Sequence, residues 1–189
     1  MNAELREQVV AAADRLFYAN GVQAVGMDAV RDASGVSLKR LYSLFPSKQD
    51  LVLAVLHDRS GQWQRGIDAA TARSTQPREK LLAIFDFLLE WFGDDEFRGC
   101  AFINAFGELG GSMPAVAEAV RVQKQGFGDY VAELCGELGA PDSLAPQLAI
   151  LAEGAQTTAA IAGNPDAARD ARSAAEVLIG NALAASVFQ

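Results

Sequence analysis

A short segment in the N-terminal third of the chain gathers side chains that can contact nucleic acid. Lys39 and Arg40 are adjacent cations suited to the acceptor edge of guanine. Ser37, Tyr42 and Lys48 are hydrogen-bond donors suited to phosphate oxygens. Two adjacent basic residues are by themselves more often a solvated helix face, so the interpretation depends on the elements that position them.

Catalytic chemistry finds little support in the sequence. His57 is the sole histidine, and its pairing with Cys100 as a cysteine hydrolase lacks an oxyanion-hole glycine motif and an orienting acid. Cys100 and Cys135 lie far apart without CxxC spacing, which argues against structural zinc and a disulfide framework. We expect no enzyme activity, no metal and no cofactor. Cys100 should be a small buried hydrophobe, with a redox role as an open alternative.

The charge of the chain is unevenly distributed. Its net charge of −8 disfavours nucleic acid overall, but residues 1–60 carry equal numbers of acidic and basic side chains. Any polyanion should therefore meet the N-terminal third. The longest uncharged run, residues 177–189, falls short of the roughly 18 residues of a membrane span, and the N-terminus lacks the apolar segment of a secretory signal. We expect a cytoplasmic protein.

Apolar residues at helical spacing predict helices almost throughout and no strand. In the N-terminal part, Ser37 can cap a third helix, and Ser47 with Asp50 has the spacing of a capping box for a fourth. The four helices expected there cover residues 3–19, a short segment between Gly26 and Gly35, residues 37–45, and residues 48 to about 70.

The third of these helices is short and needs the first two as braces. Leu41 and Phe45 should point inward together with Val36. A brief helix braced by two others is how a helix-turn-helix offers one helix to the DNA major groove. The positions expected to point outward are Leu38, Lys39, Arg40, Ser43 and Leu44.

The run from Gly35 to Leu51, Gly-Val-Ser-Leu-Lys-Arg-Leu-Tyr-Ser-Leu-Phe-Pro-Ser-Lys-Gln-Asp-Leu, resembles the helix-turn-helix signature of TetR/AcrR-type transcriptional regulators. That family shows Gly-Val-Ser, a variable pair or triplet, Leu-Tyr, two variable residues and Phe-Pro-Ser-Lys. Ala12-Ala13, Leu16-Phe17 and Asn20-Gly21 also resemble its first helix and turn. The resemblance covers about residues 5–55.

The resemblance implies that Tyr42 and Lys48 contact phosphates, as Ser37 can, and that Leu38, Lys39, Arg40, Ser43 and Leu44 face bases. Lys39 and Arg40 are the better candidates for guanine, whereas the two leucines would read thymine methyls or nothing. One departure concerns Val25-Gly26, where the family commonly has a Thr-Thr or Thr-Ser pair. The loss of that hydroxyl removes a cap and a phosphate contact, so operator affinity should be weaker than usual.

Beyond residue 60 the sequence predicts a larger helical bundle. Helices should start at Pro77, cover about residues 101–109, and run from Pro114 to Leu138. A pocket for an apolar or aromatic ligand could be lined by Trp63, Phe87, Trp91, Phe102, Phe106 and Tyr130. The polar residues that could orient such a ligand are Asn104, Gln123, Gln156, Thr157 and Thr158. Aromatic residues at helical spacing are more often core, and that alternative stays open.

Two final helices, from Ser143 to about Ala162 and from Pro165 to about Val187, are rich in alanine. Paired with their copies they would form a four-helix dimer interface, as the resemblance implies, and an intramolecular hairpin is the alternative. The small residues concerned are Ala152, Ala155, Ala159, Ala160, Ala175, Ala182 and Ala185. The larger ones are Leu148, Leu151, Ile161, Val177, Leu178, Ile179, Leu183 and Val187.

Together these patterns predict an all-α protein with a helix-turn-helix DNA-binding domain over residues 1–47 and a ligand-binding and dimerisation domain over 48–189. We expect a homodimeric, ligand-responsive regulator that binds a palindromic operator in double-stranded DNA. We expect a repressor, released by a small apolar or aromatic molecule. The alternatives are an activator of the same fold and a helical protein-interaction module without DNA binding.

Overall fold

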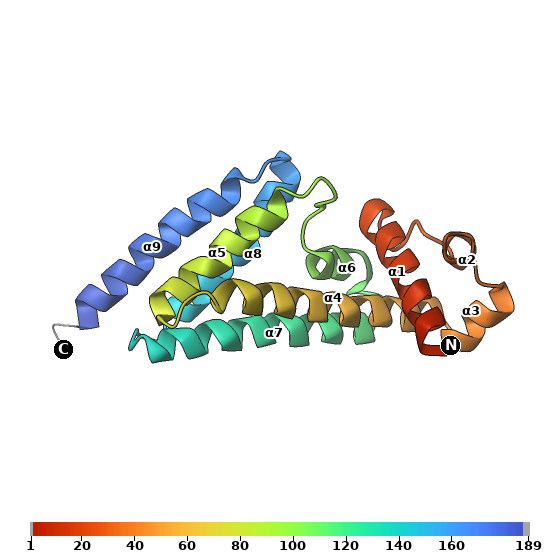
Figure 1. Cartoon of the computed structure of the whole chain (residues 1–189), viewed down its shortest axis with the longest axis horizontal. Helices are drawn as coiled ribbons and strands as arrows, with labels where there is room; N and C mark the ends of the chain where they lie inside the picture. The colour runs from red at the N-terminus through yellow and green to blue at the C-terminus, as the bar shows by residue number, and fades with distance from the viewer. Residues whose placement is uncertain (1, 187–189) are drawn as a thin grey trace. The chain divides into compact units, whose positions relative to one another are not determined.

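The computed structural model of the chain describes residues 2–186, with side chains described up to residue 184. Within that range the elements are α1 (Asn2–Asn20), α2 (Met27–Ser34), α3 (Leu38–Leu44), α4 (Lys48–Thr71), α5 (Pro77–Phe92), α6 (Ala101–Leu109), α7 (Pro114–Glu137), α8 (Leu144–Ala162) and α9 (Asp166–Ser186) (Figure 1). The predicted all-α fold is confirmed, and each expected helix is present within a few residues of its predicted bounds. The predictions for the side chains of Ala185 and Val187 lie outside the described residues.

The chain forms two compact units, and each has its own hydrophobic core. The head unit contains the residues up to Gln62 together with Cys100–Val122, and the body unit contains Trp63–Gly99 together with the residues from Gln123 onward. Helices α4 and α7 therefore contribute residues to both units. The domain boundary expected between residues 47 and 48 stays a prediction.

The core of the head unit is built from one apolar face of each N-terminal helix. Val9, Ala13 and Phe17 supply the α1 face, Val30 comes from α2, and α6 adds Phe102. Each of these side chains is buried, so the short helices α2 and α3 pack into an apolar core that they share with longer helices. Packing of this kind stabilises helices that are too short to persist alone in water.

Local capping fixes where α3 and α4 begin. The hydroxyl oxygen of Ser37 accepts a hydrogen bond from the backbone N–H of Arg40, at 3.2 Å. At the start of α4, the backbone N–H of Ser47 donates to Asp50 Oδ2 at 3.0 Å, and the N–H of Asp50 donates to Ser47 Oγ at 3.1 Å. This is the reciprocal capping box predicted from the sequence, and it is confirmed. Gly35 ends α2 in the left-handed region at φ +68°, which glycine adopts without strain.

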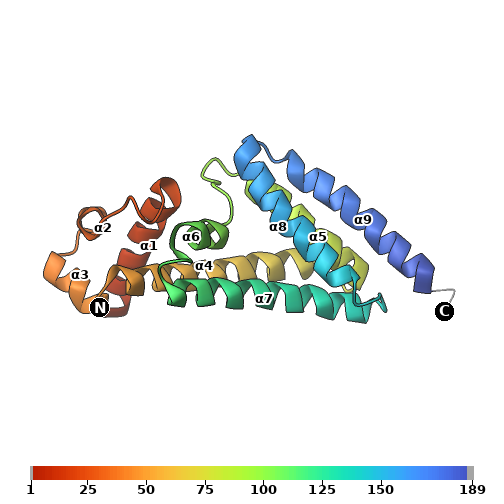
Figure 2. The ribbon, with the colours of Figure 1, turned by 180° about the vertical axis from the view of Figure 1, so that it is seen from behind.

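The body unit packs α8 and α9 against α5, and the three helices lie side by side (Figures 1 and 2). Small side chains allow the close approach, because Ala152, Ala155, Ala159, Ala168 and Ala175 are all buried. Of the alanines expected at the dimer interface, Ala152, Ala155, Ala159 and Ala175 are buried in this way, so the expectation is wrong for these four. They pack inside one chain, as do Leu148 and Ile179.

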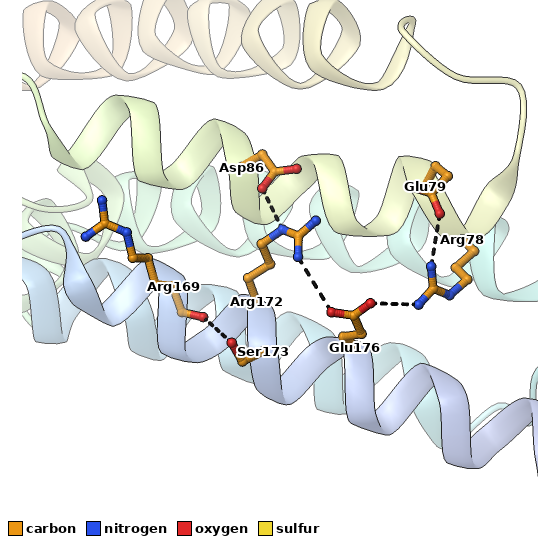
Figure 3. Close-up of polar contacts among 7 residues, drawn as sticks. All are labelled: Arg78, Glu79, Asp86, Arg169, Arg172, Ser173 and Glu176. Carbon is orange, nitrogen blue, oxygen red and sulfur yellow. Dashed lines mark hydrogen bonds and ion pairs between the residues drawn. The ribbon is translucent and has the colours of Figure 1, made fainter.

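Ion pairs join α5 to α9 at the surface of the body unit (Figure 3). Arg172 Nε donates to Asp86 Oδ1 at 2.6 Å, and Arg78 Nη2 donates to Glu176 Oε1 at 2.9 Å. Arg172 also lies 3.7 Å from the other oxygen of Glu176, which connects the pairs. Because these groups are partly exposed, they contribute little to the stability of the unit.

One ion pair of the head unit is better shielded. Arg59 on α4 donates from Nε and Nη2 to the two carboxylate oxygens of Asp14 on α1, and each side chain is 16% exposed. The guanidinium also lies 3.7 Å from the ring centroid of Tyr18. We expect Asp14→Asn to lower the free energy of unfolding by about 2 kcal/mol, because it weakens two charge-assisted hydrogen bonds. Urea unfolding followed by circular dichroism measures this loss.

Asp28→Asn is the matched control for that measurement. Asp28 pairs with Arg31 at 2.9 Å, but its side chain is 75% exposed, so the change should stay within about 0.5 kcal/mol. Equal losses of unfolding free energy in the two variants would show that the shielding of the Arg59–Asp14 pair adds nothing to stability.

Candidate nucleic-acid interface

Helix α3 is held by two fully buried residues and presents its opposite face to solvent. Leu41 and Phe45 have no exposed surface. Leu38 and Tyr42, one turn apart, are 38% and 45% exposed. Lys39 and Ser43, also one turn apart, are exposed as well. Because residues three and four apart share one face of a helix, these four side chains form a continuous outward surface. The outward positions of Leu38, Lys39 and Ser43 agree with the prediction.

Leu44 departs from the prediction. It was expected to point outward toward bases, but it is half-buried and packs against the core of the head unit. Its backbone carbonyl accepts a hydrogen bond from Arg6 Nη1 at 3.3 Å, and the same guanidinium lies 4.3 Å from the ring centroid of Phe45. Leu44, the last residue of α3, therefore belongs to the contact between α3 and α1 and is a poor candidate for base contact.

Arg40 is turned toward the start of α1. Its Nη2 donates to the side-chain oxygen of Asn2, and the residue is half-buried. To contact a base, the Arg40 guanidinium must therefore leave the side chain of Asn2 and donate to a guanine edge instead. Ser43 Oγ donates to the backbone carbonyl of Arg40 at 2.8 Å. The Ser37 oxygen serves as the cap acceptor, and a hydroxyl in that role can still donate its proton to a phosphate.

Lys48 lies at the start of α4, where backbone amides favour an anion. Its Nζ donates to the backbone carbonyl of Gln23 at 3.4 Å and lies 6.0 Å from the ring centroid of Phe17. Burial lowers the pKa of Lys48 below its ordinary value, and the nearby carboxylate of Glu108 opposes that shift. A bound phosphate would favour the charged ammonium in the same way.

The start of α2 lacks a side-chain cap, as predicted from Val25-Gly26 in place of the family's hydroxyl pair. Gly26 occupies the cap position in an extended conformation, and no side chain completes the cap there. Val25 is buried instead of offering a hydroxyl.

Sequence reasoning missed Glu108, which contacts the turn between α1 and α2 from α6. Its carboxylate accepts hydrogen bonds from the backbone amides of Val22 and Gln23, more than eighty residues earlier in the chain. No local spacing could reveal this contact, because it depends on the tertiary packing of α6 in the head unit.

The six aromatic residues predicted to line a ligand pocket fall in different units. Trp63, Phe87, Trp91 and Tyr130 belong to the body unit, whereas Phe102 is buried in the core of the head unit. Phe106 also belongs to the head unit and is largely exposed. Their ligand-binding roles stay predictions.

Four of the body-unit aromatics form a dense cluster. Trp63 makes edge-to-face contacts with Phe87, Trp91 and Phe127 at centroid distances of 5.5, 5.6 and 5.6 Å. A Cβ added at Gly66 would lie 2.5 Å from the Phe87 ring, so the absence of a side chain there permits the contact. Tyr130 donates its hydroxyl to Thr71 Oγ1 at 3.0 Å.

An apolar crevice in the body unit is too narrow to admit a water molecule; it is lined by Leu81, Ile84, Phe85, Phe127, Val131, Leu148 and Ala152. Two polar residues expected to orient a ligand lie one helical turn from this lining. Gln156 is fully buried, and its Nε2 donates to the carbonyl of Ala152 at 3.2 Å. Among the described side chains, the buried Oε1 atoms of Gln123 and Gln156 are the two without a hydrogen-bond partner.

The other three polar candidates are less enclosed. Asn104, Thr157 and Thr158 are exposed, and Thr157 Oγ1 donates to the carbonyl of Glu153 at 3.4 Å. Asn104 belongs to the head unit.

The cysteines and the histidine do not form a reactive site in the described part of the chain. Cys100 is buried in the head unit, as expected for a small hydrophobe, whereas His57 is exposed. Cys135 is buried in the body unit, and this burial raises its pKa. The described residues contain no cluster of His, Cys, Asp and Glu suited to a metal ion. Across residues 2–186, every helix is too short or too polar to cross a lipid bilayer.

Sequence comparison places the head among known DNA-binding domains. Residues 9–55 match the family described as "Bacterial regulatory proteins, tetR family". The HTH-type transcriptional activator FasR of Mycolicibacterium smegmatis is 33% identical over 131 residues, covering 69% of this chain and 58% of FasR. An uncharacterised HTH-type transcriptional regulator of Mycobacterium tuberculosis is 26% identical over 121 residues, covering 64% of this chain and 60% of that protein. The matched region thus spans less than two thirds of either relative.

Comparison of structures extends the similarity over most of the chain. A TetR-family transcriptional regulator from Streptomyces coelicolor superposes with a TM-score of 0.89 at 28% identity, covering 96% of this chain and 97% of that one. The multidrug binding protein EbrR, solved with malachite green, shares the fold with a TM-score of 0.72 at 19% identity, covering 92% and 96% of the two chains. FasR and the Streptomyces coelicolor protein are named as transcriptional regulators and not as enzymes, in agreement with the prediction from the sequence. The matching head, the common fold and the related regulators show together that this chain belongs to the TetR family.

Proposed function

We propose that the protein is a transcriptional regulator that binds an operator through α3 and responds to a small ligand in the body unit. The observation that carries the proposal is the division of α3 into a buried anchor and an exposed face. Leu41 and Phe45 fix the helix, and Leu38, Lys39, Tyr42 and Ser43 are free of the core. This is the arrangement by which a helix-turn-helix reads the major groove.

The direction of regulation has two candidates. We expected a repressor from the family resemblance. The relative FasR is named as an activator, and its identity of 33% favours activation as a second candidate. A reporter gene under a promoter that carries the bound operator separates them, because deletion of the regulator raises expression in one case and lowers it in the other.

A second copy of the chain is the proposed partner of α8 and α9. Ile150 and Ile161 lie three helical turns apart on α8 and are 70% and 83% exposed, and Val177 on α9 is 61% exposed. Large aliphatic side chains gain stability when a partner covers them. A two-fold dimer would also place two α3 helices on half-sites about 34–36 Å apart or a multiple of that, which doubles the base contacts.

The body unit is the proposed ligand site, and its crevice must open to admit a ligand. Its lining is apolar, and the buried oxygens of Gln123 and Gln156 need hydrogen-bond donors. A ligand with an apolar or aromatic body and one donor group would meet both demands. EbrR, which has this fold, binds the aromatic dye malachite green. The ligand would change operator affinity only as far as it binds one conformation of the protein, competent or not competent for DNA binding, more tightly than the other. The expected size of this coupling is about 1–3 kcal/mol.

Selection of bound duplexes from a random pool tests the proposed function. We expect the wild-type protein to recover a palindromic consensus, because two copies of α3 would read symmetric half-sites. Arg40→Ala should relax the preference at one position of each half-site and cost about 1–3 kcal/mol on the selected operator. Recovery of no consensus would contradict sequence-specific regulation, and equal losses on every sequence would make Arg40 a phosphate contact.

Lys48→Ala should weaken binding to all duplexes alike, because it removes a phosphate contact that carries no sequence information. Fluorescence anisotropy over a salt series should show the slope of log affinity against log salt reduced by about 1. Arg169→Ala is the control, since it removes one exposed positive charge from α9. A slope equal to that of the control would exclude Lys48 from the contact.

Val177→Asp should weaken the dimer, because it places a carboxylate on the face proposed to be covered by a second copy. Sedimentation velocity should show a shift toward the single chain, together with weaker operator binding. Val122→Asp is the matched control, since Val122 is 59% exposed on α7. An unchanged dimer in the Val177 variant would place the interface elsewhere.

A further inference from the structure

The turn between α1 and α2 is closed by a carboxylate from α6. The backbone N–H of Val22 donates to Glu108 Oε1 at 3.0 Å, and the N–H of Gln23 donates to Glu108 Oε2 at 2.8 Å. The side-chain amide of Gln23 donates in turn to the backbone carbonyl of Glu108. Three hydrogen bonds therefore join one residue of α6 to one turn of the head unit.

Backbone geometry explains why a carboxylate fits this turn. Gly21 follows α1 with φ +85°, in the left-handed region, so the next two amides converge on one point. Two converging N–H groups form an anion site, and a carboxylate offers each of them its own oxygen. A Cβ at Gly21 would lie 3.3 Å from the Glu108 oxygens, so the turn and the carboxylate are closely fitted.

The same turn is connected to the proposed phosphate contact. The backbone carbonyl of Gln23 accepts from Lys48 Nζ at 3.4 Å, so Gln23 is held by Glu108 through its N–H and holds Lys48 through its carbonyl. Helix α6 itself is firmly placed, because Phe102, Ala105 and Leu109 are buried in the core shared with α1–α4.

We propose that Glu108 is a positioning residue for DNA binding. It fixes the turn before α2 and, through Gln23, the ammonium of Lys48 at the start of α4. This inference rests on the proposed function, since it concerns the same DNA-binding surface.

The test compares Glu108→Gln with Glu118→Gln in the full chain. Glutamine keeps one acceptor oxygen, so one of the two amides loses its partner. Glu118→Gln removes the same charge from the exposed pair with Arg121 on α7 and controls for the weaker repulsion of DNA. Anisotropy on the selected operator over a salt series gives affinity, salt slope and the active fraction of each protein. Amide hydrogen exchange reports Val22 and Gln23 directly.

We expect the Glu108 variant to bind the operator about tenfold more weakly than the control, with an unchanged salt slope and faster exchange at Val22 or Gln23. The slope is unchanged because no phosphate contact is lost. A lower active fraction with normal affinity would reduce Glu108 to a purely structural residue and overturn the proposal.

Two other results would also overturn it. Tighter binding with a steeper slope would mean that Glu108 competes with phosphate for Lys48, and affinity equal to that of the control would mean that it has no role in binding. If the wild-type protein binds no duplex, the proposed function fails, and the exchange data still show whether the Glu108 contact exists.

Discussion

The proposed DNA-binding surface depends on the burial of Leu41 and Phe45. Helix α3 has seven residues, too few to persist alone in water, because nucleation of a helix costs more than so few hydrogen bonds return. Its stability therefore comes from the apolar anchor and from the Ser37 cap at its start. The anchor also fixes the rotation of the helix, so a residue is outward only where it lies opposite Leu41 and Phe45.

That constraint explains how much of the head could be predicted from the sequence. Caps and helical spacing are local, and they gave the bounds of α3 and the capping box of Ser47 and Asp50 correctly. Leu44 was misplaced because it follows the buried Leu41 by three residues and therefore shares the inward face of α3. Glu108 was missed because its partners are distant in the chain, and a lone glutamate on an amphipathic helix has no distinguishing pattern.

The body unit shows the same difference between local and tertiary information. Alanine-rich α8 and α9 were predicted as helices, but small residues permit close approach to any neighbour and do not say which. The structure assigns the buried alanines to the packing within one chain. Ile150, Ile161 and Val177 remain outside that packing, so exposure, and not composition, identifies the surface available to a second copy.

Two buried glutamine oxygens connect the packing of the body unit with its proposed response. A buried acceptor without a donor costs about 1–3 kcal/mol, and the structure has two such oxygens, on Gln123 and Gln156. Coupling between ligand and operator is of the same size, about 1–3 kcal/mol. A ligand that supplies a donor to either oxygen would therefore recover free energy on the scale that such coupling requires.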